Sequence, residues 1–152
     1  MFHRMFVIMV SLALTPLAFA SRPAHAATRT LLHPLRYIAY EYATAQRGKW
    51  YCWGGGGPSC YDCSGLVSAA YQHIHIWFGR STYDMLRSGR LIRISRAQAR
   101  RGDLAFFGPG HVELVDRANI TFGAHNLGTR IGWARSGPYW HPTVFYRVSG
   151  TG

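Results

Sequence analysis

A chain of 152 residues, 48% of them hydrophobic, is long enough for one domain with a single core and leaves no room for a second module. Its net charge of +11 comes from sixteen arginines and one lysine against six acidic residues. Such a charge favours anionic cell-wall polymers, membranes or nucleic acid as partners. Nucleic acid is excluded as the expected partner because no DNA-binding module is recognisable.

The first 26 residues have the pattern of a secretory signal peptide, with a basic start and an apolar run over residues 5–20. Ala24-His25-Ala26 supplies the small residues of a signal-peptidase site, so we expect cleavage directly after it, with Ala18-Phe19-Ala20 as the alternative site. A transmembrane anchor would need about 20 apolar residues, and Pro16 interrupts a shorter run. The protein is therefore predicted to be secreted and to act at the cell wall, without stable insertion in a membrane.

Residues 27–152 are predicted to form a single monomeric domain with its core over residues 34–148. Loss of Arg4 and Arg22 with the leader would leave 15 basic and six acidic residues. The densest run of positive charge is expected either to hold anionic wall polymers or to be a solvated surface. We call this run the arginine-rich face, and it comprises Arg87, Arg90, Arg93, Arg96, Arg100 and Arg101.

Apolar residues at helical spacing predict three helices in the first half of the domain. The first is expected over residues 34–46, followed by a loop over residues 49–62. The second is expected over residues 63–73. Ser81-Thr82-Tyr83-Asp84 is typical of a capping box and predicts a short third helix that ends near residues 88–89.

Beyond these helices the hydrophobic period changes to two, which predicts short strands broken by glycine, proline or asparagine. The expected strands are Leu91 to Ile94, Leu104 to Phe107, His111 to Asp116, Ile120 to Ala124, Arg130 to Ala134 and Thr143 to Val148. Helices followed by strands indicate an α+β domain, with N-terminal helices packed on a mainly antiparallel sheet of about five to six strands.

Three cysteines in an exported chain suggest one disulfide and one free thiol. Cys52 and Cys60 bracket a loop with four consecutive glycines that could use a tether, so we expect these two to pair and Cys63 to be free. The alternative is a Cys60/Cys63 redox dithiol, because such a pair before a helix is the thioredoxin arrangement. That interpretation lacks the preceding strand of a βαβ unit. The cysteine spacing fits no common zinc site, and no metal is expected.

The tetrad Asp62-Cys63-Ser64-Gly65 stands at the head of the second predicted helix. Unpaired backbone N–H groups and the helix dipole favour a thiolate there, and thiolate is the nucleophilic form of cysteine. Further along the chain, a glycine-rich turn leads into His111 at the start of a predicted strand. A cysteine on a helix and a histidine on a strand are the minimal parts of a cysteine hydrolase, with Cys63 as nucleophile and His111 as general base.

Five short motifs occur in an order and spacing that point to a family. They are Tyr51-Cys52-Trp53-Gly54-Gly55, Asp62-Cys63-Ser64-Gly65-Leu66-Val67, Arg80-Ser81-Thr82, Gly102-Asp103-Leu104-Ala105-Phe106-Phe107 and Gly110-His111-Val112. Together they resemble the NlpC family of papain-like cell-wall cysteine endopeptidases over roughly residues 34–148. The resemblance implies a papain-like fold without metal or organic cofactor. It also implies cleavage within peptidoglycan stem peptides, most typically between γ-linked D-glutamate and a diamino acid.

The group that orients the imidazole departs from the family pattern. The resemblance places a histidine or another polar residue twelve positions after the base, where this chain has Gly123, which has no side chain for the task. His125 lies two residues on and shares the face of a continuing strand, so we assign it this role, with Asn126 or a backbone carbonyl as alternatives. Glu113 and Asp116 are expected to face opposite sides of the sheet and not to form a glycosidase pair.

The resemblance also assigns substrate contacts. It implies that Tyr51 hydrogen-bonds to the substrate or to the developing oxyanion, and that Asp62 and Ser64 bind the free amino end of a stem peptide. Arg80 matches the family's arginine before a serine or threonine. The alternative interpretations are aromatic packing for Tyr51, capping of the second helix for Asp62 and a plain surface position for Arg80.

Functions of other classes stay open on the sequence alone. A non-catalytic protein would bind cell walls without releasing peptides, and the glycine in place of the family's histidine favours it. An exported thiol oxidoreductase would use Cys60 and Cys63. A related amidase that cuts a different wall bond, or a toxin aimed at competing cells, would use the same machinery as the endopeptidase.

Overall fold

The computed structural model describes residues 33–152. The predicted signal peptide and its cleavage site lie outside this range. No helix among the described residues has the length and hydrophobicity needed to cross a membrane.

Three helices form where the sequence predicts them: α2 (Leu35–Thr44), α3 (Cys63–Gln72) and α4 (Thr82–Arg87). Side chains cap two of these helices. The carboxylate of Asp62 accepts a hydrogen bond from the backbone N–H of Gly65 at the start of α3. At the start of α4, Ser81 and Asp84 form the predicted capping box. The cap at Asp62 matters for function because it fixes where α3, and with it Cys63, begins.

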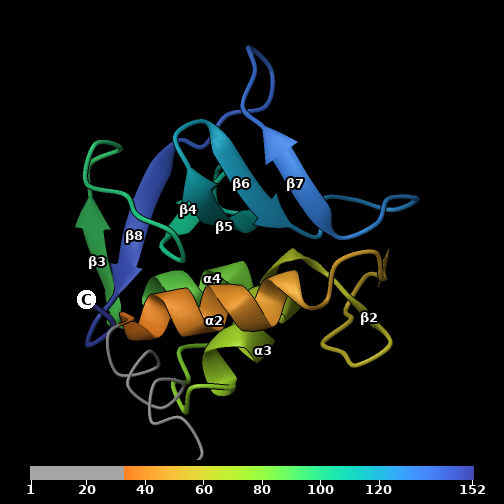
Figure 1. Cartoon of the computed structure of the whole chain (residues 1–152), viewed down its shortest axis with the longest axis horizontal. Coiled ribbons are helices and arrows are strands. Elements are labelled where there is room, and N and C mark those ends of the chain that lie inside the picture. Colours follow the sequence, from red (N-terminus) through yellow and green to blue (C-terminus); the bar gives the residue numbers. More distant parts are fainter. Residues whose placement is uncertain (1–32) are drawn as a thin grey trace, which may run out of the picture. The chain divides into compact units, whose positions relative to one another are not determined.

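All six predicted strands are present and form one antiparallel sheet (Figure 1). They are β3 (Leu91–Ile94), β4 (Leu104–Phe106), β5 (Val112–Arg117), β6 (Ile120–Gly123), β7 (Gly132–Arg135) and β8 (Val144–Val148). Their order across the sheet is β3-β8-β4-β5-β6-β7, so the last strand lies between the first two and β5 and β6 are neighbours near the middle. The predicted α+β architecture is confirmed.

The segment over residues 49–62 is not wholly loop, and this prediction was wrong in part. Two-residue strands, β1 (Trp50–Tyr51) and β2 (Cys60–Tyr61), pair in parallel and bring Trp50 opposite Cys60. Strands of two residues are too short to show a hydrophobic period. The hydrogen bond from the Tyr51 amide to the Thr129 carbonyl ties β1 to the connection between β6 and β7.

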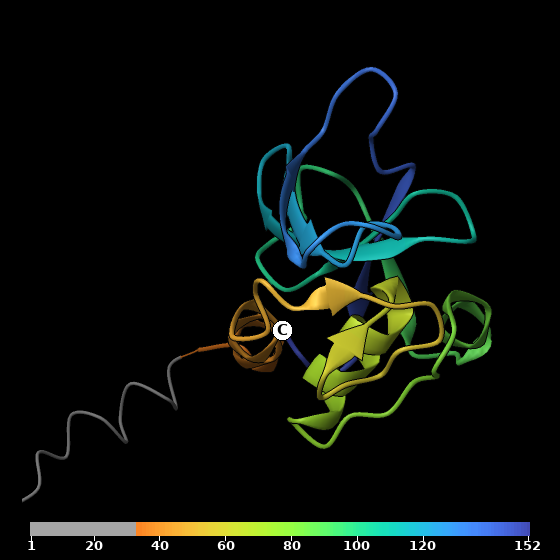
Figure 2. The ribbon, with the colours of Figure 1, turned by 90° about the vertical axis from the view of Figure 1, so that its right-hand side faces the viewer.

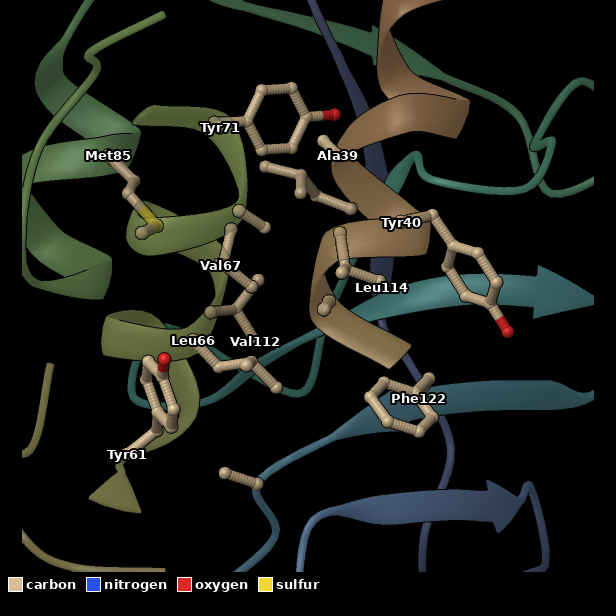
Figure 3. Close-up of a cluster of buried hydrophobic side chains, with 14 of the residues drawn as sticks. Ala39, Tyr40, Tyr61, Leu66, Val67, Tyr71, Met85, Val112, Leu114 and Phe122 are labelled. Atoms are coloured by element: carbon tan, nitrogen blue, oxygen red, sulfur yellow. The ribbon is translucent and has the colours of Figure 1, made fainter. Parts of the chain in front are cut away.

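The core lies between the helices and the sheet, and the helices gather on one side of the sheet in both ribbon views (Figures 1 and 2). Figure 3 shows Leu66 on α3 facing Leu114 on β5, with Tyr40 of α2 beside Phe122 of β6. These side chains are buried, and removing a large apolar side chain from water contributes roughly 1.5–3 kcal/mol each. The packing of α3 on β5 brings Cys63, the first residue of the helix, into contact with the backbone of Val112, the first residue of the strand.

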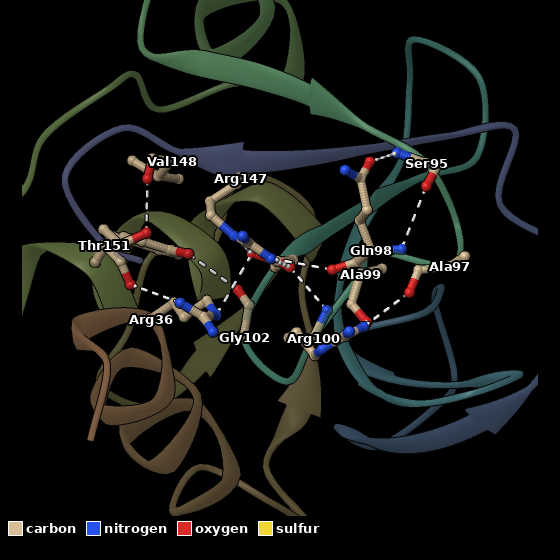
Figure 4. A network of polar contacts seen from close by, with 12 residues as sticks. Arg36, Ser95, Ala97, Gln98, Ala99, Arg100, Gly102, Arg147, Val148 and Thr151 are labelled. Carbon is tan, nitrogen blue, oxygen red and sulfur yellow. Dashed lines mark hydrogen bonds and ion pairs between the residues drawn. The ribbon is translucent and has the colours of Figure 1, made fainter. Parts of the chain in front are cut away.

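A buried carboxylate, Asp103, joins α2 to the last strand of the sheet. Asp103 is fully buried, and Arg147 of β8 donates two hydrogen bonds to it at 2.9 and 2.6 Å. Arg36 of α2 approaches the same carboxylate at 3.7 Å and donates to the carbonyl of Thr151 at 3.0 Å. The two guanidinium groups converge beside Gly102 in Figure 4.

Replacing Asp103 with alanine is expected to lower the free energy of unfolding by about 3 kcal/mol, because two partly buried arginines lose their counter-charge. Urea unfolding followed by circular dichroism measures this loss. The matched control is Asp84→Ala, which removes an exposed capping carboxylate and should cause a clearly smaller loss. Equal losses in the two variants would contradict a structural role for the buried pair.

Candidate active site

Cys63 is the first residue of α3, and it is buried. The structure contains the predicted disulfide between Cys52 and Cys60, so Cys63 is the free cysteine. This pairing takes Cys60 out of the dithiol that the oxidoreductase alternative requires. The sulfur therefore lies at a helix N-terminus, where the dipole and backbone N–H groups favour its ionised form.

His111 directly precedes β5 and hydrogen-bonds through its imidazole to the Cys63 thiol. The backbone of Val112 also hydrogen-bonds to the sulfur. Aromatic rings hold the imidazole from its other sides, with ring centroids 5.4 Å away for Phe107 and 5.0 Å away for Trp140. The structure thus brings the two predicted catalytic residues into direct contact.

The contact between the two side chains changes the ionisation of both. Burial alone would raise the pKa of Cys63, but the hydrogen bond to His111 and the imidazolium charge lower it below its ordinary value. Burial alone would lower the pKa of His111, but hydrogen bonds to Cys63 and to Glu113 raise it to about 9. Both shifts favour a thiolate–imidazolium ion pair near neutral pH.

Glu113, and not His125, contacts the far nitrogen of the His111 imidazole, so the predicted placement of His125 against that ring is corrected. His111 Nε2 lies 2.9 Å from Glu113 Oε1, and His125 Nδ1 lies 2.6 Å from the same oxygen. Thr121 donates its hydroxyl hydrogen to Oε2. Asn126 is exposed, and its backbone N–H donates to the Thr129 hydroxyl.

The Glu113 carboxylate is fully buried, and three donors surround it. Burial would raise the pKa of Glu113, but the hydrogen bonds from the two imidazoles lower it to about 2. The sequence contained one signal for this residue: a carboxylate in an apolar strand, two positions after His111, lies on the same face of the strand as the imidazole. Its possible partner Asp116 binds Tyr40 and Arg101 instead, so the two carboxylates do not form a pair.

His111, Glu113 and His125 could also be ligands for a metal ion, since one ligand atom from each lies within 4.8 Å of the others. Both histidines, however, are already in direct hydrogen-bonding contact with one carboxylate oxygen. A chain of hydrogen bonds satisfies the polar atoms of this cluster without an ion.

A cleft with a volume of about 510 Å³ opens over the Cys63 sulfur. It is lined by the nucleophile and by all four residues that the family resemblance assigns to substrate: Tyr51, Asp62, Ser64 and Arg80. The exposed aromatic rings of Trp53 and Tyr83 also line it. The predicted nucleophile and the residues predicted for substrate contact therefore line one cavity, and His111 directly follows Gly110 on its wall.

Arg80 is held in place, unlike a plain surface arginine. It donates to both carboxylate oxygens of Asp62 at 3.0 Å, to the Ser64 hydroxyl at 3.2 Å and to the carbonyl of Gly55 at 2.8 Å. Asp62 thus caps α3 and pairs with Arg80 at the same time. Burial raises the pKa of the Tyr51 hydroxyl, and the nearby negative charges of Cys63 and Asp62 raise it further.

Residues 48–147 match the model of the NlpC/P60 family. The chain belongs to the NlpC/P60 family. The peptidoglycan endopeptidase RipB of Mycobacterium tuberculosis is 40% identical over an alignment of 96 residues, and the match covers 50% of this chain and 39% of RipB. The probable endopeptidase YafL of Escherichia coli is 35% identical over 94 residues, which are 60% of this chain and 38% of YafL. This NlpC/P60 chain thus spans about two fifths of the length of the curated relatives it matches.

The crystal structure of the M. tuberculosis peptidoglycan hydrolase RipB has the same fold as this NlpC/P60 domain. The two align with a TM-score of 0.65 and 25% identity, over 90% of this chain and 73% of the RipB chain. The family and the papain-like fold predicted from the sequence are confirmed.

Proposed function

We propose that this NlpC/P60 domain is a cysteine endopeptidase that acts outside the cytoplasm on peptidoglycan stem peptides. The observation that carries the proposal is the contact between Cys63 and His111 at a cleft lined by Tyr51, Asp62 and Arg80. The expected bond is the one between γ-linked D-glutamate and a diamino acid. The relatives named as endopeptidases support the same reaction class.

The chemistry follows from the ion pair. The Cys63 thiolate attacks the amide carbonyl, while backbone N–H groups at the start of α3 and the Tyr51 hydroxyl stabilise the oxyanion. The His111 imidazolium gives its proton to the departing amine, which leaves an acyl-enzyme. His111 then takes a proton from water, which attacks the thioester and releases the carboxylic acid. No metal or organic cofactor takes part in these steps.

Asp62 and Ser64 are proposed to receive the free amino end of the stem peptide. The Asp62 carboxylate is an anionic acceptor on the cleft wall, and its contacts with Arg80 fix its orientation. A primary ammonium group at that point would place the following amide bonds along the cleft toward Cys63. A stem peptide has a free amino end only after it has been released from the glycan. The enzyme is therefore expected to cut released stem peptides and not those still bound to a glycan strand.

The test is digestion of free stem peptides, which an amidase has released from purified sacculi, and in parallel of intact sacculi, followed by mass spectrometry of the soluble products. An endopeptidase of this specificity releases fragments whose new amino group belongs to the diamino acid. Release of whole stem peptides from intact sacculi would indicate an amidase instead. Binding to cell walls without cleavage would indicate a non-catalytic wall protein. Gly123, which lacks the family's orienting side chain, favoured this alternative, but Glu113 lies beside Gly123 and contacts the His111 imidazole in its place.

The pH dependence of hydrolysis is expected to have two limbs set by the ion pair. The lowered pKa of Cys63 keeps the thiolate present below the ordinary thiol value of about 8.5. The His111 imidazolium, needed to protonate the leaving amine, is lost as the pH rises through about 9. kcat/KM should therefore be high at neutral pH and fall above about 9. An acid limb at the ordinary thiol pKa would contradict this ionisation.

The arginine-rich face is proposed to hold the enzyme on anionic wall polymers. Five of its six arginines are exposed, while Arg101 is half-buried and pairs with Asp116 at 3.0 Å. Arg93 lies on β3, an edge strand, and the exposed Arg135 lies on β7, the opposite edge.

Retention of the protein on sacculi should weaken with added salt and with Arg93→Gln, by about two- to fivefold at low salt. Cosedimentation of a Cys63→Ala background measures retention without digestion. Arg135→Gln is the matched control and should have a smaller effect. Retention that is indifferent to salt would count against electrostatic binding.

A further inference from the structure

We propose that Glu113 is the residue that positions the His111 imidazole, and that position 123 is glycine because the Glu113 side chain fills the space beside it. The inference rests on the proposed function for the roles of Cys63 and His111. It assigns to one strand a task that the family pattern gives to the neighbouring strand. Glu113 acts through His111 and does not touch the reacting bond.

The hydrogen bond between Glu113 and His111 fixes the orientation of the ring. His111 Nε2 donates to Glu113 Oε1 at 2.9 Å, so the remaining ring nitrogen is the one that serves the Cys63 sulfur. A carboxylate behind the ring also stabilises the imidazolium, the form that must protonate the leaving amine. Orientation and charge therefore come from the same buried group.

Glu113 is itself held in one position. Its Oε1 also accepts from His125 Nδ1 at 2.6 Å, and its Oε2 accepts from the Thr121 hydroxyl. The side chain is fully buried, so water does not compete for these bonds. His125 was predicted to contact the His111 imidazole directly. It instead holds the Glu113 carboxylate, which in turn orients that imidazole.

Gly123 completes the arrangement by leaving space. A Cβ added at Gly123 would lie 2.6 Å from Cγ of Glu113 and 3.1 Å from its Cβ and Cδ, which is too close for real contacts. Gly123 does not have the positive φ that would by itself favour glycine. The nearest atoms to such a Cβ all belong to Glu113, which explains why position 123 has no side chain. The space behind the His111 imidazole can hold a side chain from position 113 of β5 or from position 123 of β6, but not both.

Three variants test the proposal. In Glu113→Gln the shape is kept and the charge is lost, so kcat should fall at least about tenfold with little change in KM. Gly123→Ala should push Glu113 from the ring and lower kcat in the same way. In the exchange variant, Glu113→Gly with Gly123→Glu, a carboxylate enters the same space from β6 and should restore most of the activity lost in Glu113→Gln. Glycine is chosen at position 113 because a Cβ there would lie too close to the new glutamate side chain at position 123.

The decisive readout is the rate at which iodoacetamide alkylates Cys63 as a function of pH, because it needs no substrate. Because the reagent reacts with the thiolate, the wild-type rate should rise at a pH below the ordinary thiol pKa of about 8.5. Glu113→Gln removes the charge that stabilises the imidazolium, so its rate should rise at a higher pH than that of the wild type. Asp116→Asn is the matched control: it alters an equally buried carboxylate on the same strand that binds Tyr40 and Arg101. Its alkylation profile should match that of the wild type.

The proposal is overturned if Glu113→Gln, folded by circular dichroism, keeps the wild-type alkylation profile and kcat. It is also overturned if the exchange variant folds and recovers no activity. A wild-type protein with the expected alkylation profile but no cleavage of free stem peptides would refute the proposed function and leave the role of Glu113 standing. The two failures are therefore separable.

Discussion

Replacing Cys63 with alanine is expected to lower kcat/KM for stem-peptide hydrolysis by about 10⁴-fold or more. The reason is that every covalent step passes through this sulfur, and residues of a catalytic unit lose nearly all of their joint effect when one is removed. Cleavage of a defined free stem peptide, followed by liquid chromatography, measures the loss.

The fold should survive this change, because the cap at Asp62 and the packing of α3 do not use the sulfur. The unfolding midpoint of the variant therefore serves as the control for intact structure. Undiminished release by a folded Cys63→Ala variant would refute the nucleophile assignment.

Replacing His111 with alanine is expected to lower kcat/KM by about 10³-fold or more and to raise the pKa of Cys63 toward its ordinary value of about 8.5. The imidazole supplies the hydrogen bond and the charge that favour the thiolate, and without it burial of the sulfur favours the thiol. The measurement pairs hydrolysis with the rate of Cys63 alkylation at neutral pH, and both should fall.

The matched control for His111 is His73→Ala, at an exposed histidine that stacks on Tyr42 at the end of α3. It should leave both rates unchanged. If His111→Ala lost hydrolysis while alkylation stayed at the wild-type rate, the imidazole would not be the group that ionises the thiol.

Local patterns were enough to predict most of the fold. The capping residues at Asp62 and Ser81 set the starts of two helices, and alternating hydrophobicity set all six strands of the sheet to within about two residues. The disulfide between Cys52 and Cys60 also followed from spacing and compartment. The pair β1 and β2 did not, because two-residue strands depend on contacts that are distant in sequence, such as the bond from Tyr51 to Thr129.

The candidate site was predictable to the extent that it lies in contiguous motifs. Cys63 and His111 each stand in a short motif that resembles the NlpC family, and Asp62, Ser64 and Arg80 line the cleft together with Cys63. Glu113 was not predicted, because its role depends on which strand is the neighbour of β5 and on the space left at Gly123. The family pattern places the orienting residue twelve positions after the histidine, on β6. It therefore cannot predict an orienting residue that comes from β5.

The ultraviolet absorbance of the thiolate, measured against pH as the difference between wild type and Cys63→Ala, tests the ion pair of Cys63 and His111 most directly. The structure predicts that thiolate absorbance develops at a pH below the ordinary thiol pKa of about 8.5, because the hydrogen bond and charge of His111 lower the pKa of Cys63. A difference spectrum that develops only around that ordinary value would show a neutral thiol beside a neutral imidazole. That result would contradict the central claim that Cys63 is held as a reactive thiolate by His111.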